Sequence, residues 1–311
     1  MDKVEIVEVG PRDGLQIIPQ FVPTATKIAM IRALVAAGFK RMELGSFVSP
    51  KAVPQMADMD EVVAGLGPLL GVRGMVLVPN SIGAKRAIAA GITDLIFVIS
   101  MSDSHNRSNV RRPTDASIED LRAMLAEIDP DKRLKLRIGL ATTFHCPFEG
   151  VMDEGKVFAT MERIAALRDG FEFSLSDTTG MAMPDHVKRF SKRCLDAFGS
   201  RATFCFHGHD TAGYGIANVL AAWEAGIKSF DGAVAGLGGC PFAPGATGNI
   251  ASEDMVTFFH RMGVDTGIDI DRLLEAGKIA ASLPGAVTSG HARAIPRQRL
   301  MGDGVPLKDA A

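Results

Sequence analysis

The feature that most constrains this chain is a regular alternation of short apolar runs with longer amphipathic stretches, from one end to the other. The short runs are rich in β-branched residues, as in buried parallel strands, and the longer stretches carry apolar residues at helical spacing. This pattern predicts eight strand–helix units. The predicted strands are residues 4–9, 41–44, 72–78, 94–99, 134–141, 171–175, 202–207 and 230–234, and the predicted helices are 24–37, 53–66, 81–90, 117–128, 154–167, 184–197, 215–225 and 252–262.

Eight consecutive units favour a closed (β/α)8 TIM barrel over an open, doubly wound α/β sheet. The open sheet would need a G-x-G-x-x-G fingerprint after its first strand, and this chain has GPRDG at residues 10–14. No Pro/Ser-rich linker divides the 311 residues, so we predict one barrel over residues 1–264 rather than two domains. Residues 265–311 are predicted to form a C-terminal helix (271–282) and a tail, packed on the barrel or at a subunit interface.

Charge and composition exclude several classes of protein. The 34 Lys and Arg against 36 Asp and Glu give a formal net charge of −2, and no long run of like charge offers a surface for nucleic acid. The four cysteines have no C-x-x-C spacing, which argues against a zinc knuckle or a thioredoxin-type pair. No apolar run is long enough to span a membrane, and no signal-peptide pattern is present. We therefore expect a cytoplasmic protein without nucleic-acid or membrane partners.

The sharpest local signal is His207-Gly208-His209, at the end of the seventh predicted strand. Residues i and i+2 of a strand point the same way, so both imidazoles would face the same end of the barrel. Asp13 and Asn249 follow the first and eighth strands, which lie close to the seventh in a closed barrel, and would add two oxygen ligands to a metal site. Ligand softness alone favours Zn, Fe or Mn over Mg. The alternative is a pair of hydrogen-bonded histidines without a metal.

Two acids and one arginine are candidates for catalytic roles. Arg12, beside Asp13, can stabilise a developing negative charge such as an enolate oxygen, with Glu43 orienting it. The alternative is a structural ion pair of Arg12 with Glu43 or Glu8. Asp177 can act as a base or as a hydrogen-bond partner of a histidine, and it can equally be the N-cap of the following helix.

Other candidates lie in the loops that follow the strands, where TIM barrels carry their active sites. Cys240 stands in the glycine-rich segment 236–241 and can donate a proton from a mobile lid, although a buried inert thiol is the alternative. Arg107 in the fourth loop can pair with a phosphate of the substrate or remain a solvated surface charge. The remaining candidates for substrate binding are polar residues just after the strands, namely Gln16, Ser46, Thr142 and Thr178.

Five ordered motifs resemble those of the 3-hydroxy-3-methylglutaryl-CoA (HMG-CoA) lyases, a family of the DRE-TIM metallolyase superfamily. The resemblance covers about residues 4–262, and the second motif matches this family rather than the related synthases of isopropylmalate and homocitrate. The motifs are VEVGPRDGLQ (7–16), FVSPKAVPQMAD (47–58), SDTTG (176–180), HGHDTAG (207–213) and GGCPFAPGATGN (238–249).

The resemblance implies retro-Claisen cleavage of an HMG-CoA-type thioester to acetyl-CoA and acetoacetate, as in leucine degradation and ketone body metabolism. It implies an acyl-CoA substrate and a homo-oligomer, either a dimer or a tetramer. It also implies a divalent ion, Mg²⁺ or Mn²⁺. The ligands of that ion would be Asp13, His207, His209 and Asn249.

The same resemblance implies a role for each catalytic candidate. His207 or Asp177 would take the proton of the tertiary hydroxyl. Arg12 would hold the enolate oxygen after the C–C bond breaks, and Cys240 or a water-relayed acid would protonate the enolate carbon.

Several positions depart from the family pattern around the predicted substrate site. The family usually has Asn-Glu-Lys at residues 17–19, where this chain has Ile-Ile-Pro, and it commonly has Cys where this chain has Gly208. His145 stands where Gly is usual, and residues 211–214 also differ. The alternatives are therefore a lyase of a different 3-hydroxyacyl-CoA, a Claisen-type synthase of the isopropylmalate, homocitrate or citramalate kind, and a non-catalytic CoA- or metal-binding barrel.

Overall fold

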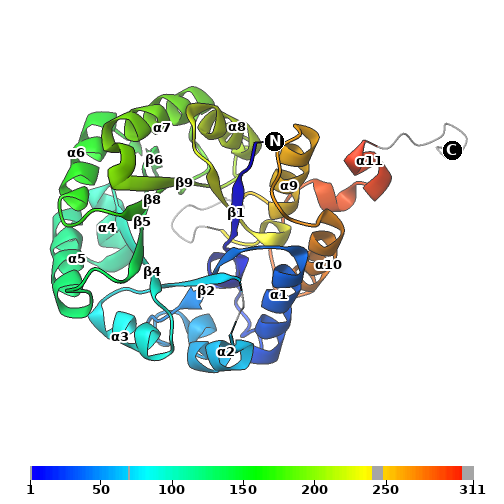
Figure 1. Cartoon of the computed structure of the whole chain (residues 1–311), viewed down its shortest axis with the longest axis horizontal. Coiled ribbons are helices and arrows are strands. Elements are labelled where there is room, and N and C mark those ends of the chain that lie inside the picture. Colours follow the sequence, from blue (N-terminus) through cyan, green and yellow to red (C-terminus); the bar gives the residue numbers. More distant parts are fainter. Residues whose placement is uncertain (1, 69–70, 240–247, 303–311) are drawn as a thin grey trace, which may run out of the picture.

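The computed structural model describes residues 2–68, 71–239 and 248–302. Eight parallel strands close into a barrel that a ring of helices surrounds (Figure 1), which confirms the predicted TIM barrel. The strands follow chain order around the barrel, and β1 closes it against β10. They are β1 (Glu5–Glu8), β2 (Arg41–Ser46), β3 (Arg73–Leu77), β4 (Asp94–Ser100), β5 (Lys135–Ala141), β8 (Phe171–Asp177), β9 (Ala202–Gly208) and β10 (Ser229–Gly232).

The helices cover the outer face of the barrel and bury their apolar sides against the strands. Gly38 ends the first helix with φ of 109°, a left-handed conformation that favours glycine. The helices are α1 (Thr24–Ala37), α2 (Met59–Leu66), α3 (Ser81–Ala89), α4 (Asp103–Val110), α5 (Thr114–Ile128), α6 (Glu154–Ala165), α7 (Pro184–Phe198), α8 (Gly215–Ala225), α9 (Ser252–Arg261), α10 (Ile270–Ala281) and α11 (Arg297–Met301), with short turns η1 (Gly10–Gly14), η2 (Pro54–Met56), η3 (Gly199–Arg201), η4 (Val234–Gly236) and η5 (Ala292–Ala294).

The interior of the barrel holds charge as well as apolar side chains. Val7, Met75 and Ile96 form a small apolar cluster inside it, separate from the larger core between strands and helices. Barrel interiors are usually filled by branched aliphatic residues. Here four charged side chains form linked ion pairs, which we call the ion-pair cluster: Arg41, Arg137, Glu172 and Asp231.

Strand register brings the first and seventh predicted units together. Asp231 of β10 lies beside His207 of β9, and Gly232 of β10 lies beside Glu8 of β1. The turn η1 follows β1 directly, so it meets the carboxyl end of β9 across the single strand β10. This arrangement places Asp13, in η1, near the two histidines.

Three local predictions differ from the structure around the fourth and fifth loops. The segment expected as the fourth loop contains the helix α4, whose N-cap Ser102 accepts a hydrogen bond from the backbone N–H of His105 at 3.2 Å. The next helix, α5, begins at Thr114 rather than residue 117; Pro113 precedes it in an extended conformation, and Asp103 Oδ1 accepts the N–H of Thr114 at 2.8 Å. The fifth loop contains a two-stranded hairpin, β6 (His145–Cys146) with β7 (Gly150–Val151), that periodicity over two residues could not reveal.

The predicted C-terminal helix is present as α10. It packs beside α1, where Arg272 donates a hydrogen bond to the carbonyl of Ala36 at 2.9 Å and the N–H of Asp269 binds the carbonyl of Ala37 at 2.8 Å. Whether this segment also meets another subunit stays a prediction. Among the described residues, no helix combines the length and hydropathy that crossing a membrane requires.

Candidate functional site

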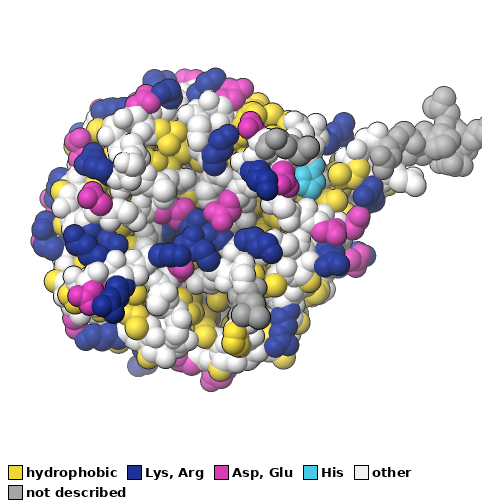
Figure 2. Space-filling view, viewed as in Figure 1, with side chains coloured by type: hydrophobic (Ala, Val, Ile, Leu, Met, Phe, Trp, Pro, Cys, Tyr) yellow, Lys and Arg dark blue, Asp and Glu magenta, His cyan; other side chains and the backbone are white. Residues whose placement is uncertain are grey.

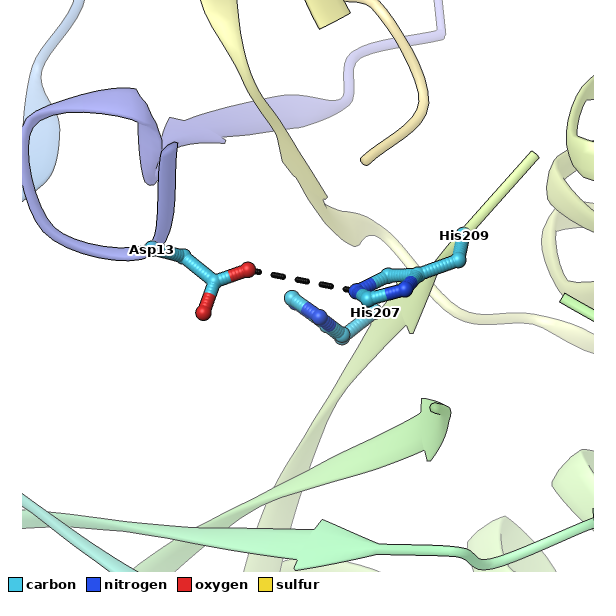
Figure 3. A group of neighbouring side chains, drawn as sticks. All are labelled: Asp13, His207 and His209. Carbon is cyan, nitrogen blue, oxygen red and sulfur yellow. Dashed lines mark ion pairs between the residues drawn. The ribbon is translucent and has the colours of Figure 1, made fainter. Parts of the chain in front are cut away.

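Three side chains that could hold a metal ion converge at the carboxyl end of the barrel. Asp13 comes from η1, His207 from the end of β9 and His209 from just after it (Figure 3). Each offers one ligand atom, and these atoms lie within 4.8 Å of one another. We call these three residues the donor cluster. The spacing of the two histidines along an extended segment puts both rings on one side, with their centroids 5.4 Å apart.

Asn249 lies against this cluster and fits the same site. Its Nδ2 donates to Asp13 Oδ2 at 2.8 Å and to the carbonyl of Leu237 at 3.0 Å. Within the part of the chain that the structure describes, the buried Asn249 Oδ1 and His209 Nδ1 have no hydrogen-bond partner. Buried polar atoms without partners are rare. Carboxylate and amide oxygens together with imidazole nitrogens are ligands of divalent metals, so the residues present fit such an ion.

The electrostatics of the cluster suit cation binding. Burial alone would raise the pKa of Asp13, but Arg12 and the two histidines outweigh it and hold that pKa below its usual range. Burial lowers the pKa of His209 to about 4, with His207 contributing. Burial also acts to lower the pKa of His207, yet its hydrogen bond to Asp231 raises the pKa overall. At neutral pH the cluster therefore contains an ionised carboxylate and a neutral imidazole, both ready to bind a cation.

Arg12 lies between two carboxylates beside the donor cluster. Its Nε donates to Glu43 Oε2 at 2.5 Å, and its Nη1 forms an ion pair with Asp13. Glu43 therefore fixes the guanidinium, a contact that fits both interpretations of the sequence, an oriented catalytic arginine and a structural ion pair. Gln16 adds a hydrogen bond from Nε2 to Asp13 Oδ1 at 3.0 Å, so this residue touches the proposed ligand. Glu8, the other proposed partner of Arg12, instead accepts backbone and hydroxyl hydrogen bonds under the loops.

Asp177 ends β8, and its carboxylate binds the backbone of the following loop. Its two oxygens accept the N–H groups of Met181 and Ala182 at 3.1 and 3.0 Å. The helix α7 begins only at Pro184 and has no side-chain cap, so Asp177 is not the N-cap that the sequence offered as an alternative. Burial raises the pKa of Asp177 to about 6, against the hydrogen bonds from the loop, which favour its ionised form.

The other candidates for substrate binding lie at the end of a strand, in two of the loops that follow strands, and on a helix. Ser46 ends β2 and is buried. Thr142 has φ of 57°, and its N–H donates to Thr178 Oγ1 at 2.8 Å, so these two residues join the fifth and sixth loops. Arg107 lies exposed on α4 and pairs with Asp103 at 3.0 Å. Cys240 falls outside the described residues.

The close packing around β9 explains one departure from the family pattern. A Cβ atom on Gly208 would lie 2.8 Å from Ile250 Cδ1 and 2.9 Å from Phe206 Cε1. The phenylalanine and isoleucine side chains occupy the space that a side chain at this position would need. A larger residue here would require Ile250 and Phe206 to move, so glycine suits this position with these neighbours.

The sequence analysis missed two residues that touch the site. Asp231 Oδ2 lies 3.1 Å from His207 Nδ1, and Arg137 Nη1 lies 2.7 Å from Asp231 Oδ1. Each is a charged residue inside a short strand, LKLRIGLA and SFDG, whose other residues are apolar or small apart from Lys135 at the start of the first. Since a charge inside a barrel strand is costly unless it is paired, that signal could have marked both residues.

Comparisons with known proteins identify the family of this chain. A family model described as HMGL-like matches residues 3–279. The (R)-citramalyl-CoA lyase of Chloroflexus aurantiacus is 42% identical over 89% of this chain and 89% of its own length. The hydroxymethylglutaryl-CoA lyase of Pseudomonas mevalonii is 37% identical over 91% of this chain and 93% of its own.

Solved structures show the same relationship in three dimensions. An HMG-CoA lyase from Acinetobacter baumannii, in complex with coenzyme A and 3-methylmalate, superposes with a TM-score of 0.90 at 40% identity over 98% of both chains. The HMG-CoA lyase of Brucella melitensis gives 0.85 at 40% identity, over 91% of this chain and 99% of that one. The chain belongs to the HMGL-like family and is one of its carbon–carbon lyases.

Proposed function

We propose that this protein is a metal-dependent lyase that cleaves an HMG-CoA-type thioester by a retro-Claisen reaction, to acetyl-CoA and acetoacetate. The observation that carries this proposal is the donor cluster, with Asn249 and the oriented guanidinium of Arg12 beside it. A CoA-thioester lyase is what the named relatives share. The metal and the acyl group are the further steps that we propose.

The residues that would hold the cation are Asp13, His207, His209 and Asn249. Mg²⁺ and Mn²⁺ are the ions that the family resemblance implies, and two imidazole ligands favour Mn²⁺ of the two on softness. A divalent ion bound there would supply Lewis-acid chemistry to a hydroxyl group of the substrate.

The chain's own groups account for the proton and charge transfers. Cleavage needs a base for the tertiary hydroxyl, and the candidates are His207 and Asp177. His207 could act only where its Nε2 does not hold the cation, because its Nδ1 faces Asp231. As the C–C bond breaks, its electron pair becomes the enolate of acetyl-CoA, and Arg12 would hold the enolate oxygen while Glu43 keeps the guanidinium in place. Cys240 or a water-relayed acid would then protonate the enolate carbon.

A second acyl group is favoured by a specific observation. The 42% identical relative is named for citramalyl-CoA, whose acyl group has the same tertiary alcohol and methyl group as the HMG thioester but a carboxylate one methylene closer. This chain also replaces the usual Asn-Glu-Lys after Gln16 and carries His145 in the fifth loop. Cleavage of the shorter thioester would release pyruvate instead of acetoacetate. A Claisen-type synthase remains the alternative reaction.

The test is an activity panel with a ligand variant. The purified protein is assayed for acetyl-CoA release from HMG-CoA, citramalyl-CoA and related 3-hydroxyacyl thioesters, with Mn²⁺, with Mg²⁺ and after chelation. We expect cleavage that needs the metal. Asp13→Ala should lower it by at least about 10³-fold, because metal catalysis supplies several kcal/mol. The control Asp265→Ala removes an exposed acid that pairs with Lys3 and should leave the activity unchanged.

Three results would contradict the proposal in different ways. Full activity after chelation or in Asp13→Ala would remove the metal site. Thiol release from acetyl-CoA and a 2-oxo acid, without any cleavage, would make the protein a synthase. Pyruvate rather than acetoacetate as the product would assign the shorter substrate. That the enzyme forms dimers or tetramers and is cytoplasmic also stays a prediction.

A further inference from the structure

Within the donor cluster, His207 is held in place by a carboxylate deeper in the barrel. Its Nδ1 lies 3.1 Å from Asp231 Oδ2. Arg137 Nη1 reaches both oxygens of Asp231, at 2.7 and 3.0 Å. Cys205 Sγ lies 3.1 Å from Asp231 Oδ1, and Ser174 Oγ lies 3.5 Å from Oδ2. The carboxylate is thus held on all sides inside the barrel, with only 3% of the residue exposed.

The charge state of Asp231 decides which ring nitrogen of His207 carries the proton. The guanidinium of Arg137 contacts both oxygens of Asp231, at 2.7 and 3.0 Å, and this charge-assisted pairing keeps the carboxylate ionised. An ionised carboxylate can only accept hydrogen bonds. The proton of the neutral imidazole therefore sits on Nδ1, and the lone pair is left on Nε2.

We propose that Asp231, held by Arg137, is a positioning residue that fixes the tautomer and the ring orientation of His207 so that Nε2 serves the donor cluster. The use of Nε2 as a metal ligand rests on the proposed function, whereas the tautomer itself does not. Carboxylates that bind the second nitrogen of a ligating histidine commonly act in this way.

Arg137 also lies close to Glu43, the carboxylate that orients Arg12. Arg137 Nη1 is 3.9 Å from Glu43 Oε1, and Glu43 accepts the hydrogen bond from Arg12 Nε. Arg137 in turn is fixed by Glu172, whose Oε2 accepts from Arg137 Nε at 2.7 Å. One buried guanidinium thus supports both carboxylates that orient His207 and Arg12.

His209 offers an internal contrast. Among the described residues, its Nδ1 is buried and has no hydrogen-bond partner. In the part of the chain that the structure describes, no carboxylate binds this nitrogen, and Asp13 lies 3.9 Å from the other one, so the inference applies to His207 alone.

The first experiment reads the tautomer in the unmodified protein. The ¹⁵N shifts of His207, assigned by comparison with His207→Gln, are recorded without metal at a pH where the ring carries one proton. We expect a protonated Nδ1 and an unprotonated Nε2. A protonated Nε2 would overturn the proposal, whatever the activity assays show.

The second experiment measures Mn²⁺ binding, by the electron paramagnetic resonance of free Mn²⁺, in Asp231→Asn. The amide can donate to Nδ1 and so favours the other tautomer, and we expect Mn²⁺ affinity to fall about 10–100-fold. Since this variant removes one carboxylate partner of Arg137 and leaves it Glu172, the double variant Asp231→Asn/Arg137→Gln repeats the measurement without the excess positive charge. The control is Cys205→Ala, which removes a contact with Asp231 Oδ1 and leaves Oδ2, the oxygen that faces His207.

The outcomes separate this inference from the proposed function. Wild-type Mn²⁺ affinity in both Asp231 variants would overturn the positioning role. If the unmodified protein itself fails to bind Mn²⁺ or Mg²⁺, the metal site of the proposed function is wrong, and the tautomer measurement still decides the inference. An equal loss of affinity in Cys205→Ala would show a general effect of disturbed packing and would contradict a specific role of the carboxylate.

Discussion

The ion-pair cluster and the donor cluster lie in the same barrel and are both buried, yet they are built in opposite ways. In the ion-pair cluster each charge faces an opposite one, through Arg41 and Arg137 to Glu172, and through Arg137 to Asp231. Among the described residues, His209 Nδ1 in the donor cluster and Oδ1 of the neighbouring Asn249 have no hydrogen-bond partner; in the ion-pair cluster the same holds for Arg137 Nη2, which can only donate and so cannot bind a cation. Paired charges stabilise the interior of the barrel, whereas ligand atoms without a partner leave a site that a bound ion can fill.

The two ends of the barrel also differ in what they show to solvent. At the amino ends of the strands, Arg41, Arg73, Lys135 and Glu172 line a cleft of about 170 Å³. Figure 2 shows Lys and Arg side chains mixed with Asp and Glu at the centre of the face it presents. The arginines of this cleft are engaged in ion pairs, Arg41 and Arg137 with Glu172 and Arg73 with Asp94. We therefore assign no ligand to the cleft and treat the ion-pair cluster as a support for the site above it.

Removing the central arginine should have the largest effect on stability. Arg137→Met leaves Asp231 buried without its main partner and removes one of the two arginines that bind Glu172, and we expect the free energy of unfolding to fall by about 3–5 kcal/mol. Arg73→Met is the matched control, because its ion pair with Asp94 is 2.6 Å long but the arginine side chain is 43% exposed. That change should cost no more than about 1 kcal/mol.

Urea unfolding of both variants, followed by circular dichroism, measures the difference directly. Equal losses in the two variants would mean that the ion-pair cluster is no more important for the fold than a surface pair. The contrast between the two clusters would then fail.

The sequence predicts the fold well because the spacing of apolar residues can be read within each short segment. Eight strands and their order follow from it, and the rule that catalytic residues follow barrel strands brings Asp13, His207 and His209 together. The helix α4 was missed because its sequence, DSHNRSNV, has few apolar residues, and its cap and packing stabilise it. Asp231 and Arg137 were missed because their meaning depends on each other, and a pairing across 94 positions is not visible in either strand alone.

A change beside the donor cluster should affect catalysis far more than folding. Arg12→Lys keeps the positive charge, but a single ammonium cannot bind Glu43 and Asp13 and still hold a substrate oxygen in the geometry of the guanidinium. We expect kcat to fall about 10²–10³-fold, as when one donor to an oxyanion is lost, with KM much less affected. Steady-state kinetics on the cleaved thioester measure both constants.

The control for this variant is Arg86→Lys, which alters an exposed arginine paired with Asp60 at 2.6 Å. Its kcat should equal that of the wild type, and the melting temperatures of both variants should stay close to the wild-type value. A wild-type kcat in Arg12→Lys would remove Arg12 from the reaction and leave it as a structural partner of Glu43.

The smallest expected effect concerns Glu8, a buried acid that belongs to neither cluster. Its carboxylate accepts the N–H groups of Gly10 and Val234, both at 2.8 Å, and the hydroxyl of Ser252 at 2.7 Å. Burial nevertheless raises its pKa to about 8, because the hydrogen bonds only partly offset the loss of water. Glu8 thus joins η1 to η4 without an ion pair.

This shift predicts how stability depends on pH. The unfolded chain releases the proton of Glu8 near the ordinary value of 4.5, whereas the folded protein keeps it up to about pH 8. Between these values the folded state binds more protons, so stability should fall as pH rises. Glu8→Gln cannot titrate there, and its melting temperature should decline less between pH 5 and 8.5 than that of the wild type.

The decline should persist in part, since burial also raises the pKa of Glu253 to about 7. Glu275→Gln, an exposed change on α10, should reproduce the wild-type slope. An unchanged slope in Glu8→Gln would mean that its hydrogen bonds keep the carboxylate ionised and that it supports the loop as a charge.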